Sequence, residues 1–138
     1  MKIKVKLDAG ARLPERAHAT DAGADIRCIA GFTIAPRASA LIRTGVHVQL
    51  PPSTVGMVKS KSGLNIKHGI ISEGVIDEGF TNQIVVKLYN LSYWFHHFKA
   101  GDKITQLVVM PVLYPDFEQV DEIEGGERGD SGYGSTGR

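Results

Sequence analysis

Short stretches in which apolar and polar residues alternate recur along this chain, and they restrict its fold more than any other feature. Residues 2–7 read KIKVKL and residues 46–50 read VHVQL, so every second side chain is apolar. Successive side chains of a strand point to opposite faces, which makes this alternation typical of a half-buried strand. No window of about 12 residues carries a sustained helical stripe, and prolines interrupt the segments where a helix could grow. The sequence therefore predicts an all-β fold.

The organisation predicted along the chain is one domain followed by an arm. Residues 83–89 and 103–110 are further β-branched runs between turn residues, and residues 62–66 are the one short helical segment, which Ser62 could cap. Apolar residues thin out after residue 115, and the last 14 residues hold six glycines. Such a segment does not pack as an element of its own. We expect a domain over residues 1–124 and a flexible arm over residues 125–138.

Composition excludes several classes of protein. The net charge of +1 gives no overall attraction to nucleic acid or to an anionic membrane, so neither is expected as a partner. No segment approaches the roughly 20 apolar residues of a membrane span, and the first residues lack the apolar core of a signal peptide, which predicts a soluble, cytoplasmic protein. Cys28 is the single cysteine, which excludes an internal disulfide and the paired cysteines of zinc nucleobase deaminases.

The glycine-rich arm carries groups that bind anions and bases. Residues 132–137 match GxGxxG, but no helix can follow, so a dinucleotide-binding turn is excluded. Glycines nevertheless let backbone amides approach an anion, and Ser135 and Thr136 add hydroxyl donors. Arg128 offers a bidentate fork for phosphate, and Tyr133 offers a flat face for a base. On these residues alone, a disordered tail is the alternative.

Two further stretches are candidates for chemistry. Residues 59–69 (KSKSGLNIKHG) place serine and glycine at the start of a short helix, which favours an anion, although an ordinary solvated turn has the same pattern. Residues 73–90 indicate a β-hairpin with Asp77 just before its bend, where preceding apolar residues would desolvate the carboxylate. Glu78 would point to the opposite face, into solvent. A turn-forming role is the alternative for Asp77.

Three other features have simpler interpretations. Asp25 and Gln106 each follow a turn into a strand and are the polar side chains expected to point inward. Residues 93–98 (YWFHHF) could form a stacking or metal-binding patch, but adjacent histidines diverge on a strand. A packed loop or a subunit contact is the favoured interpretation there.

In order along the chain, five segments resemble the five motifs of the trimeric deoxyuridine triphosphatases. These segments are ATDAGADI, KSGLNIKHGI, GVIDEGF, GDKITQL and RGDSGYGSTG. Together they span residues 19–137, and their order and spacing are highly specific although each is weak alone. The resemblance implies a compact jelly-roll or β-clip barrel of the dUTPase type.

The resemblance implies a hydrolase that converts dUTP to dUMP and pyrophosphate, which keeps uracil out of DNA and supplies dUMP for dTMP synthesis. Asp77 matches the aspartate that activates water for attack on the α-phosphorus. Mg²⁺ would be held by the triphosphate and by waters, with Asp25 in the outer shell and no side chain as a direct metal ligand. The positions that match phosphate contacts are Lys61, Ser62, Gly63 and Gln106.

The resemblance also implies how dUTP would be recognised. Gly74, Val75 and Ile76, with the facing main chain at Val85, match a close-packed hairpin whose backbone reads uracil and leaves no space for a thymine methyl. Phe80 matches the aromatic residue beneath the deoxyribose. The family forms homotrimers in which the arm of one chain closes a pocket made by the other two.

In that closed site, the arm residues would contact both ends of the substrate. Tyr133 would stack on uracil and Arg128 would bind the γ-phosphate, with Gly134, Ser135 and Thr136 as further contacts. The family usually has arginine at positions 61 and 103, tyrosine at position 80 and phenylalanine at position 133. Lysine keeps the charge of arginine but loses its bidentate geometry.

Two other functions remain open from the sequence. The related deoxycytidine triphosphate deaminases resemble residues 76–90, but they carry a catalytic glutamate where this chain has Lys87. A nucleotide-sensing regulatory protein could keep the same pocket and bind a partner through residues 93–98. Release of pyrophosphate, release of ammonia, or binding without a product would distinguish the three functions.

Overall fold

The computed structural model describes residues 1–126 and residue 129, and this part of the chain contains ten strands and one helix. In chain order, the elements are β1 (Lys4–Leu7), β2 (Gly23–Arg27), β3 (Phe32–Ile34), β4 (Ser39–Arg43), β5 (Val46–Gln49), β6 (Thr54–Lys59), α1 (Ser62–His68), β7 (Ile70–Ile76), β8 (Val85–Asn90), β9 (His96–Phe98) and β10 (Lys103–Pro111). The prediction of an all-β fold with one short helix is confirmed. The single described helix is far too short to cross a membrane.

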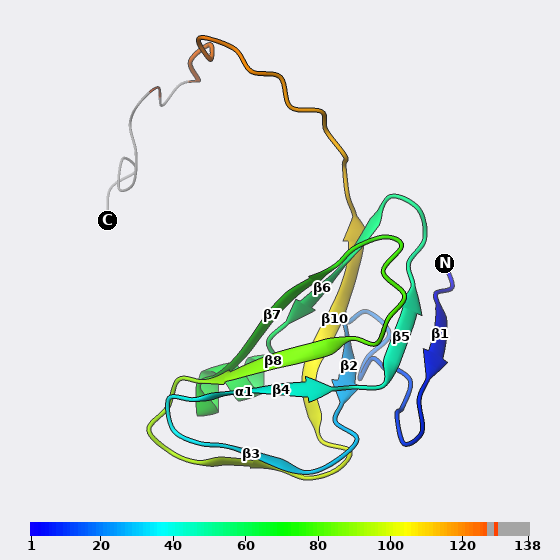
Figure 1. Ribbon diagram of the computed structural model, residues 1–138, viewed down its shortest axis with the longest axis vertical. Helices are drawn as coiled ribbons and strands as arrows, with labels where there is room; N and C mark the ends of the chain where they lie inside the picture. Colours follow the sequence, from blue (N-terminus) through cyan, green and yellow to red (C-terminus); the bar gives the residue numbers. More distant parts are fainter. Residues whose placement is uncertain (127–128, 130–138) are drawn as a thin grey trace.

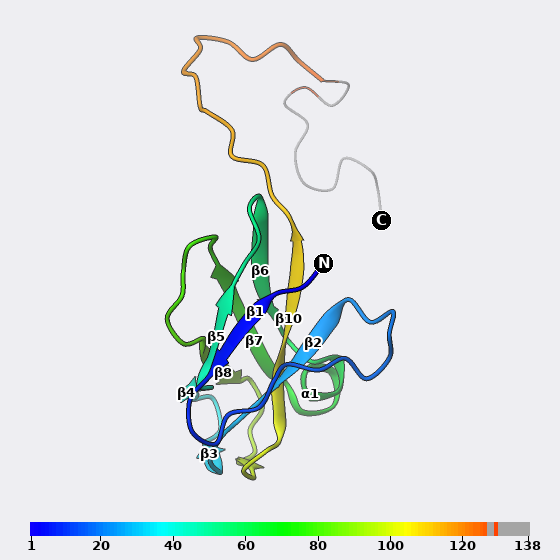
Figure 2. The ribbon, with the colours of Figure 1, turned by 90° about the vertical axis from the view of Figure 1, so that its right-hand side faces the viewer.

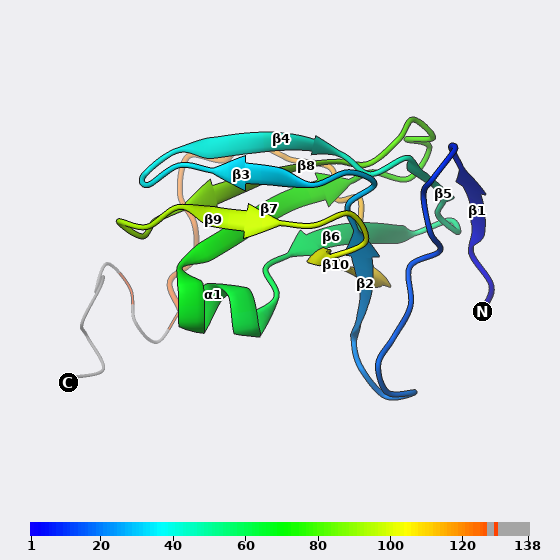
Figure 3. The same cartoon turned by 90° about the horizontal axis from the view of Figure 1, so that it is seen from below.

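Six strands form one curled sheet, and two small two-stranded sheets complete the body (Figures 1 and 3). The large sheet has the strand order β2-β10-β6-β7-β8-β4, and its neighbouring strands are antiparallel. The small sheets pair β1 with β5 and β3 with β9. Because β2, β10 and β6 are adjacent, segments distant in sequence meet at one edge of the large sheet. Figure 2 shows β2 and α1 close to the lower part of β10 in that view.

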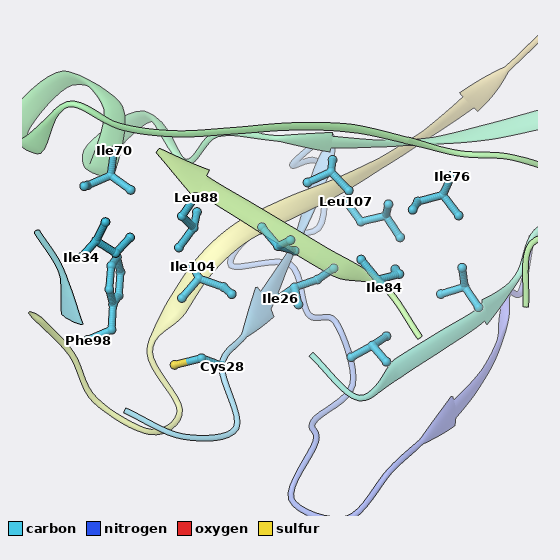
Figure 4. Close-up of a cluster of buried hydrophobic side chains, with 14 of the residues drawn as sticks. Ile26, Cys28, Ile34, Ile70, Ile76, Ile84, Leu88, Phe98, Ile104 and Leu107 are labelled. Carbon is cyan, nitrogen blue, oxygen red and sulfur yellow. The ribbon is translucent and has the colours of Figure 1, made fainter. Parts of the chain in front are cut away.

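The core consists mainly of aliphatic side chains, with Phe98 and Cys28, and it draws on the large sheet and on both small sheets (Figure 4). Ile26 of β2, Leu88 of β8 and Ile104 of β10 are fully buried, and Ile84 beside β8 is equally inaccessible. Burying one such side chain is worth about 1.5–3 kcal/mol. These residues therefore fix how the two halves of the sheet pack, and with them the positions of the polar groups at the strand ends.

A buried pair of hydroxyl groups ties three strands of the large sheet together. The Ser72 and Thr105 side-chain oxygens lie 2.7 Å apart, and the Thr105 hydroxyl donates to the Lys59 carbonyl at 2.9 Å. Both side chains are inaccessible or nearly so, and both are satisfied. This network joins β7, β10 and the end of β6, and so fixes the point from which the chain enters α1.

The predicted elements are confirmed with shifted ends, and one predicted detail is wrong. Helix α1 extends to His68, beyond the predicted residue 66, and ends at Gly69, which has φ of 64°. Its N-cap residue is Lys61 rather than Ser62, and no side chain makes a capping hydrogen bond. The Ser62 side chain is instead exposed on the first turn.

Two exposed segments project from the body of the molecule. Residues 112–126 continue from β10 and extend away from the sheets, as Figures 1 and 2 show. The loop between β8 and β9 presents Tyr93, Trp94 and Phe95, with Trp94 78% exposed. The prediction that this loop is packed is therefore wrong for the single chain, whereas a subunit contact there stays a prediction.

Candidate active site

Asp25 is the centre of a charged cluster at the edge where β2, β10 and β6 meet. Its side chain is buried, as predicted, in the second strand of the chain. One carboxylate oxygen accepts a hydrogen bond from the Lys61 ammonium group, and the other accepts one from Lys103 at 2.7 Å. Both lysine side chains remain partly exposed. Asp25 therefore holds two cations at one place, with their outer sides open to solvent.

The two lysines control the charge state of Asp25. Burial by itself raises the pKa of a carboxyl group, because a charged group loses hydration. The hydrogen bonds from Lys103 and Lys61, with the positive charges of both groups, outweigh burial and lower the pKa of Asp25 below its usual range. Asp25 is thus ionised near neutral pH, and the cluster of one carboxylate and two ammonium groups has a net positive charge. Such a cluster attracts a polyanion.

Gln106 lies next to this cluster because the facing strand has a glycine. The Gln106 amide donates to the Ser60 carbonyl at 2.9 Å, between β6 and α1. A Cβ atom added to Gly23 would lie 2.1 Å from the Gln106 side-chain oxygen, so any larger residue would displace that side chain. Gln106 is only partly buried, and it faces away from the core because its neighbour Leu107 faces into it. The prediction that Gln106 points inward is therefore wrong, and its hydrogen-bond partner is a main-chain carbonyl.

Ser62 and Gly63 lie on the same side as this cluster but take no part in its contacts. They are the first two residues of α1, directly after Lys61, and both are exposed. Nothing lies within 4 Å of a Cβ built on Gly63, so the space beside it is open. The cluster therefore has an accessible border of backbone and a hydroxyl group, which suits contact with a bulky anion.

Asp77 lies in a tight turn directly after β7. The Phe80 amide donates to the Asp77 carbonyl at 3.1 Å, and Gly79 follows with φ of 89°. Asp77 is exposed in the single chain, so the expected desolvation by its own preceding residues is absent. It also lies beyond the strand, and both Asp77 and Glu78 border the same cavity. The prediction that these two carboxylates face opposite sides is therefore wrong, because it assumed that the strand continues.

The predicted close-packed hairpin holds only at its base. Strands β7 and β8 pair from Ile70 with Asn90 to Ser72 with Leu88, and then separate. Beyond this point Gly74 and Ile76 pair with β6, whereas Val85 pairs with Arg43 of β4. Figure 1 shows the two strands diverging. Each strand therefore has one main-chain edge that pairs with no strand in the described part of the chain.

Side chains along this diverging hairpin are largely accessible. Val75 is 58% exposed, Phe80 and Val85 are also exposed, and Ile76 is buried in the core. The predicted uracil-reading residues are therefore brought together as two facing edges rather than as a closed slot. A planar polar ligand could satisfy the free main-chain donors and acceptors.

A cavity of about 630 Å³ opens beside Asp77. Its walls come from the turn between β5 and β6, from residues 77–79 and 81, and from the segment after β10, including Tyr114. Tyr114 donates to a Glu78 carboxylate oxygen at 2.6 Å. Sequence reasoning missed this link, because Glu78 was expected to be solvated and nothing in the pattern pairs it with a residue 36 positions later.

The two groups of predicted residues lie apart on one chain. Asp77 follows Ile76, which pairs with Gly56 of β6. Asp25 pairs with Gln106 of β10, and Gln106 pairs on its other side with Lys59 of β6. Gly56 and Lys59 are three residues apart on a strand, which is about 10 Å. The structure thus does not bring Asp25 and Asp77 together. Arg128, Tyr133, Gly134, Ser135 and Thr136 lie outside the described residues.

The comparisons with known proteins agree on one family. The sequence pattern of the dUTPase family matches residues 9–137. This chain belongs to the dUTPase family. Among its relatives, the deoxyuridine 5'-triphosphate nucleotidohydrolase of Clostridium kluyveri is 41% identical over 99% of this chain and 99% of its own length. The enzyme of the same name from Mus musculus is 37% identical over 97% of this chain and 83% of its own length.

Solved structures of dUTPases have the same fold. A mutant dUTPase of Staphylococcus bacteriophage 80alpha with dUpNHpp has a TM-score of 0.92 and 30% identity, with 99% of each chain covered. A mutant dUTPase from phage phi11 of S. aureus, described with a structural Mg(II) ion, has a TM-score of 0.83 and 29% identity over 91% of this chain and 100% of its own. The family and fold that the five motifs predicted are therefore confirmed.

The donors around Asp25 are compatible with a magnesium ion. Within residues 1–126 and 129, no group of three or more His, Cys, Asp or Glu side chains is placed to hold a metal ion. Both Asp25 oxygens already accept lysine hydrogen bonds, but a carboxylate oxygen has a second acceptor position. Mg²⁺ usually keeps several waters and binds one or two carboxylates plus substrate phosphates, which agrees with this set.

Proposed function

We propose that this protein hydrolyses dUTP to dUMP and pyrophosphate, keeping uracil out of DNA and supplying dUMP for dTMP synthesis. The observation that carries the proposal is the position of Asp77. An exposed carboxylate follows the unpaired edge of β7 and borders a cavity of about 630 Å³. Family membership and the names of the relatives support the substrate.

Asp77 is the proposed general base. It orients a water molecule in line with the α-phosphorus and takes one of its protons as the water oxygen attacks. The new bond joins that oxygen to the α-phosphorus, and the bond from the α-phosphorus to the oxygen bridging to the β-phosphorus breaks. Pyrophosphate leaves with the electron pair of that bridge. Asp77 lies in the turn that contains Gly79 and is closed by the Phe80 amide.

The cluster around Asp25 is proposed to bind the triphosphate. Lys61 and Lys103 present their ammonium groups, Ser62 and Gly63 add a hydroxyl group and backbone amides, and Gln106 lies beside them. Asp25 keeps the two cations in place, which lowers the cost of ordering them when the polyanion binds. Bound Mg²⁺ would neutralise phosphate charge, with Asp25 reaching it through water.

The diverging edges of β7 and β8 are proposed to read the base. The free amides and carbonyls of residues 74–76, with the facing main chain at Val85, suit the donors and acceptors on the uracil edge. Cytosine has an exocyclic amine in place of a carbonyl oxygen, so it would leave polar groups unpaired. Phe80, exposed in the turn, is proposed to lie beneath the deoxyribose and to exclude a 2′-hydroxyl group.

The separation of Asp77 from Asp25 supports a site shared between subunits. On one chain the Asp77 turn lies about 10 Å or more along the sheet from the cluster that is proposed to bind the triphosphate, so the base is not placed beside that cluster. In a homotrimer, the triphosphate cluster of one subunit can face the Asp77 turn of the next. The third subunit is proposed to supply the arm, with Tyr133 on the uracil, Arg128 on the γ-phosphate and residues 134–136 around them.

Product analysis tests this function directly. Purified protein with Mg²⁺ is given dUTP, dCTP and dTTP in separate reactions, and release of pyrophosphate and of ammonia is measured. We expect pyrophosphate from dUTP alone. Ammonia from dCTP would support the deaminase, which Lys87 argues against. Tight dUTP binding without any product would support a nucleotide sensor and contradict the proposed hydrolysis.

A further inference from the structure

Glu78 joins three segments of the chain beside the proposed catalytic base. One of its carboxylate oxygens accepts two hydrogen bonds, from the Ser53 backbone amide at 2.8 Å and from the Tyr114 hydroxyl at 2.6 Å. Ser53 lies in the turn between β5 and β6, and Tyr114 lies just after β10. Both bonds end on the residue next to Asp77. The turn that carries the base is thereby tied to two other segments.

A main-chain hydrogen bond joins the other two segments, the β5–β6 turn and the segment after β10, to each other. The Val112 amide donates to the Ser53 carbonyl at 3.0 Å, so Ser53 bonds to both of the other segments. Ser53 has φ of 57°, an unusual conformation for a residue with a side chain, and its two main-chain bonds compensate for the strain. The three segments form a small ring of hydrogen bonds along one wall of the cavity that Asp77 borders.

The charges in this ring agree with its geometry. The hydrogen bonds from Tyr114 and Ser53 lower the pKa of Glu78, so it is ionised at neutral pH and can accept both. The hydrogen bond to Glu78 raises the pKa of Tyr114, and the charge of Asp77 adds to that effect. Tyr114 and Asp77 also line the same cavity.

We propose that Glu78 is a positioning residue, which holds the Asp77 turn against the β5–β6 turn and against the start of the C-terminal segment through Tyr114. This inference rests on the proposed dUTP hydrolysis. The segment that begins at Tyr114 leads to Arg128, 14 residues later. The same link thus fixes the direction of the base and the point where the chain leaves the body toward the arm.

The hydrogen bond between Tyr114 and Glu78 is exposed, so its role in positioning Asp77 can be tested apart from any role in folding stability. Tyr114 is 64% exposed and Glu78 is also exposed, so their hydrogen bond contributes little to the free energy of unfolding. Loss of the bond would free the turn to shift. Because attack on phosphorus requires in-line geometry, a small displacement of the base lowers the rate more than it weakens binding.

A double-mutant cycle tests the proposal. The enzyme is measured as wild type, Tyr114→Phe, Glu78→Ala and the double variant, for kcat, KM and binding of the non-hydrolysable analogue dUpNHpp. We expect kcat to fall about three- to tenfold in Tyr114→Phe and about tenfold or more in Glu78→Ala, with analogue binding within about twofold. The double variant should be no slower than Glu78→Ala, because both changes break one link.

Two further variants complete the experiment. Glu78→Gln keeps a side-chain oxygen that can accept a hydrogen bond, so it should recover part of the rate lost in Glu78→Ala. Tyr93→Phe removes a hydroxyl group from an exposed tyrosine elsewhere and should leave kcat unchanged.

The proposal is overturned if the single variants retain wild-type kcat, if their effects multiply in the double variant, or if analogue binding falls as much as kcat. An inactive wild type would instead reject the proposed hydrolysis, and this inference with it.

Discussion

A single carboxylate carries the base role in the proposed reaction, so its replacement should separate chemistry from binding. Asp77→Asn keeps the size of the side chain but removes its basicity. We expect kcat for dUTP to fall by about a hundredfold to ten-thousandfold, the range typical of a general base. Binding of dUpNHpp, measured by calorimetry, should change by less than about threefold. Weak binding in this variant would assign Asp77 to recognition instead of base catalysis.

Asp25 holds two lysine side chains in place, so its replacement should lower the stability of the fold. In Asp25→Asn the two ammonium groups of Lys61 and Lys103 remain beside a neutral amide, and removing one partner of a buried ion pair is destabilising. We expect a loss on the order of 2 kcal/mol in urea unfolding and a higher KM for dUTP. Asp116→Asn, an exposed carboxylate, is the matched control and should change stability by less than about 0.5 kcal/mol.

The pH dependence of stability follows from the same contacts. Burial opposes the shift, but the lysine hydrogen bonds leave the pKa of Asp25 lower in the folded chain than in the unfolded chain. The stabilisation is therefore complete above the unfolded pKa of about 3.9 and is lost as pH falls through the lower, folded value. The stability difference between wild type and Asp25→Asn should narrow below about pH 4. A constant difference down to pH 2 would contradict the assigned ion pairs.

Residue types could be predicted from the sequence more easily than their partners. Asp25 and Gln106 were expected to point inward because each enters a strand from a turn. Asp25 is buried, whereas Gln106 is only partly buried, on the face of β10 opposite the core residue Leu107. The two ion pairs of Asp25 could not be predicted from sequence spacing, because Lys61 and Lys103 come close to Asp25 only when β2, β10 and β6 lie side by side. For the same reason, the hydrogen-bond partners of Glu78 could not be predicted: it is exposed, as expected, but its partners come from two distant segments.

At the scale of elements, the close approach of β2 and β10 depends on one glycine. Gly23→Ala would place a Cβ 2.1 Å from the Gln106 amide oxygen and 3.0 Å from its Cβ. The Gln106 side chain can swing away, at the cost of its hydrogen bond to Ser60. We expect a loss of about 1 kcal/mol in stability and a several-fold rise in KM, with kcat less affected.

Gly63→Ala is the matched control for the loss of stability. The space around Gly63 is open and α1 favours alanine, so the helix should gain rather than lose stability. A crystal structure or a methyl NMR spectrum of Gly23→Ala would show whether Gln106 has moved. An unmoved Gln106 with wild-type KM would remove it from the proposed phosphate site.

Strands with a long alternating apolar pattern could be predicted from the sequence. Short strands that pair with a segment far along the chain could not. Residues 46–49 and 103–111 form β5 and β10 as expected from their apolar patterns. Strands β3 and β9 have three residues each and form only because Phe32 pairs with Phe98 across the fold. The hairpin of residues 73–90 was predicted closed, yet it opens after Ser72, where, among the described strands, β7 pairs only with β6 and β8 only with β4 along their outer edges.

At the scale of the whole molecule, several large apolar side chains are exposed on the described surface. Leu41 of β4 is 70% exposed on the outer face of the sheet, and Leu113, Phe117 and Ile123 project from the segment after β10. Extended apolar segments without a core of their own are typical of chains that pack on a neighbour. This surface, with the separation of Asp25 from Asp77, favours an assembly in which neighbours complete each other's sites.

Mixed trimers provide the sharpest test of a shared site. Asp77→Asn chains and chains truncated after Gly126 should each be inactive, the first without the base and the second without the arm. If each site takes its base and its arm from different chains, refolding an equal mixture should restore about a quarter of the wild-type activity, since each requirement is met half the time. If both come from one chain, no mixed site is complete and activity stays at the level of the parents. A mixture that shows no recovery, in trimers verified by ultracentrifugation, would therefore reject the proposed division of the site.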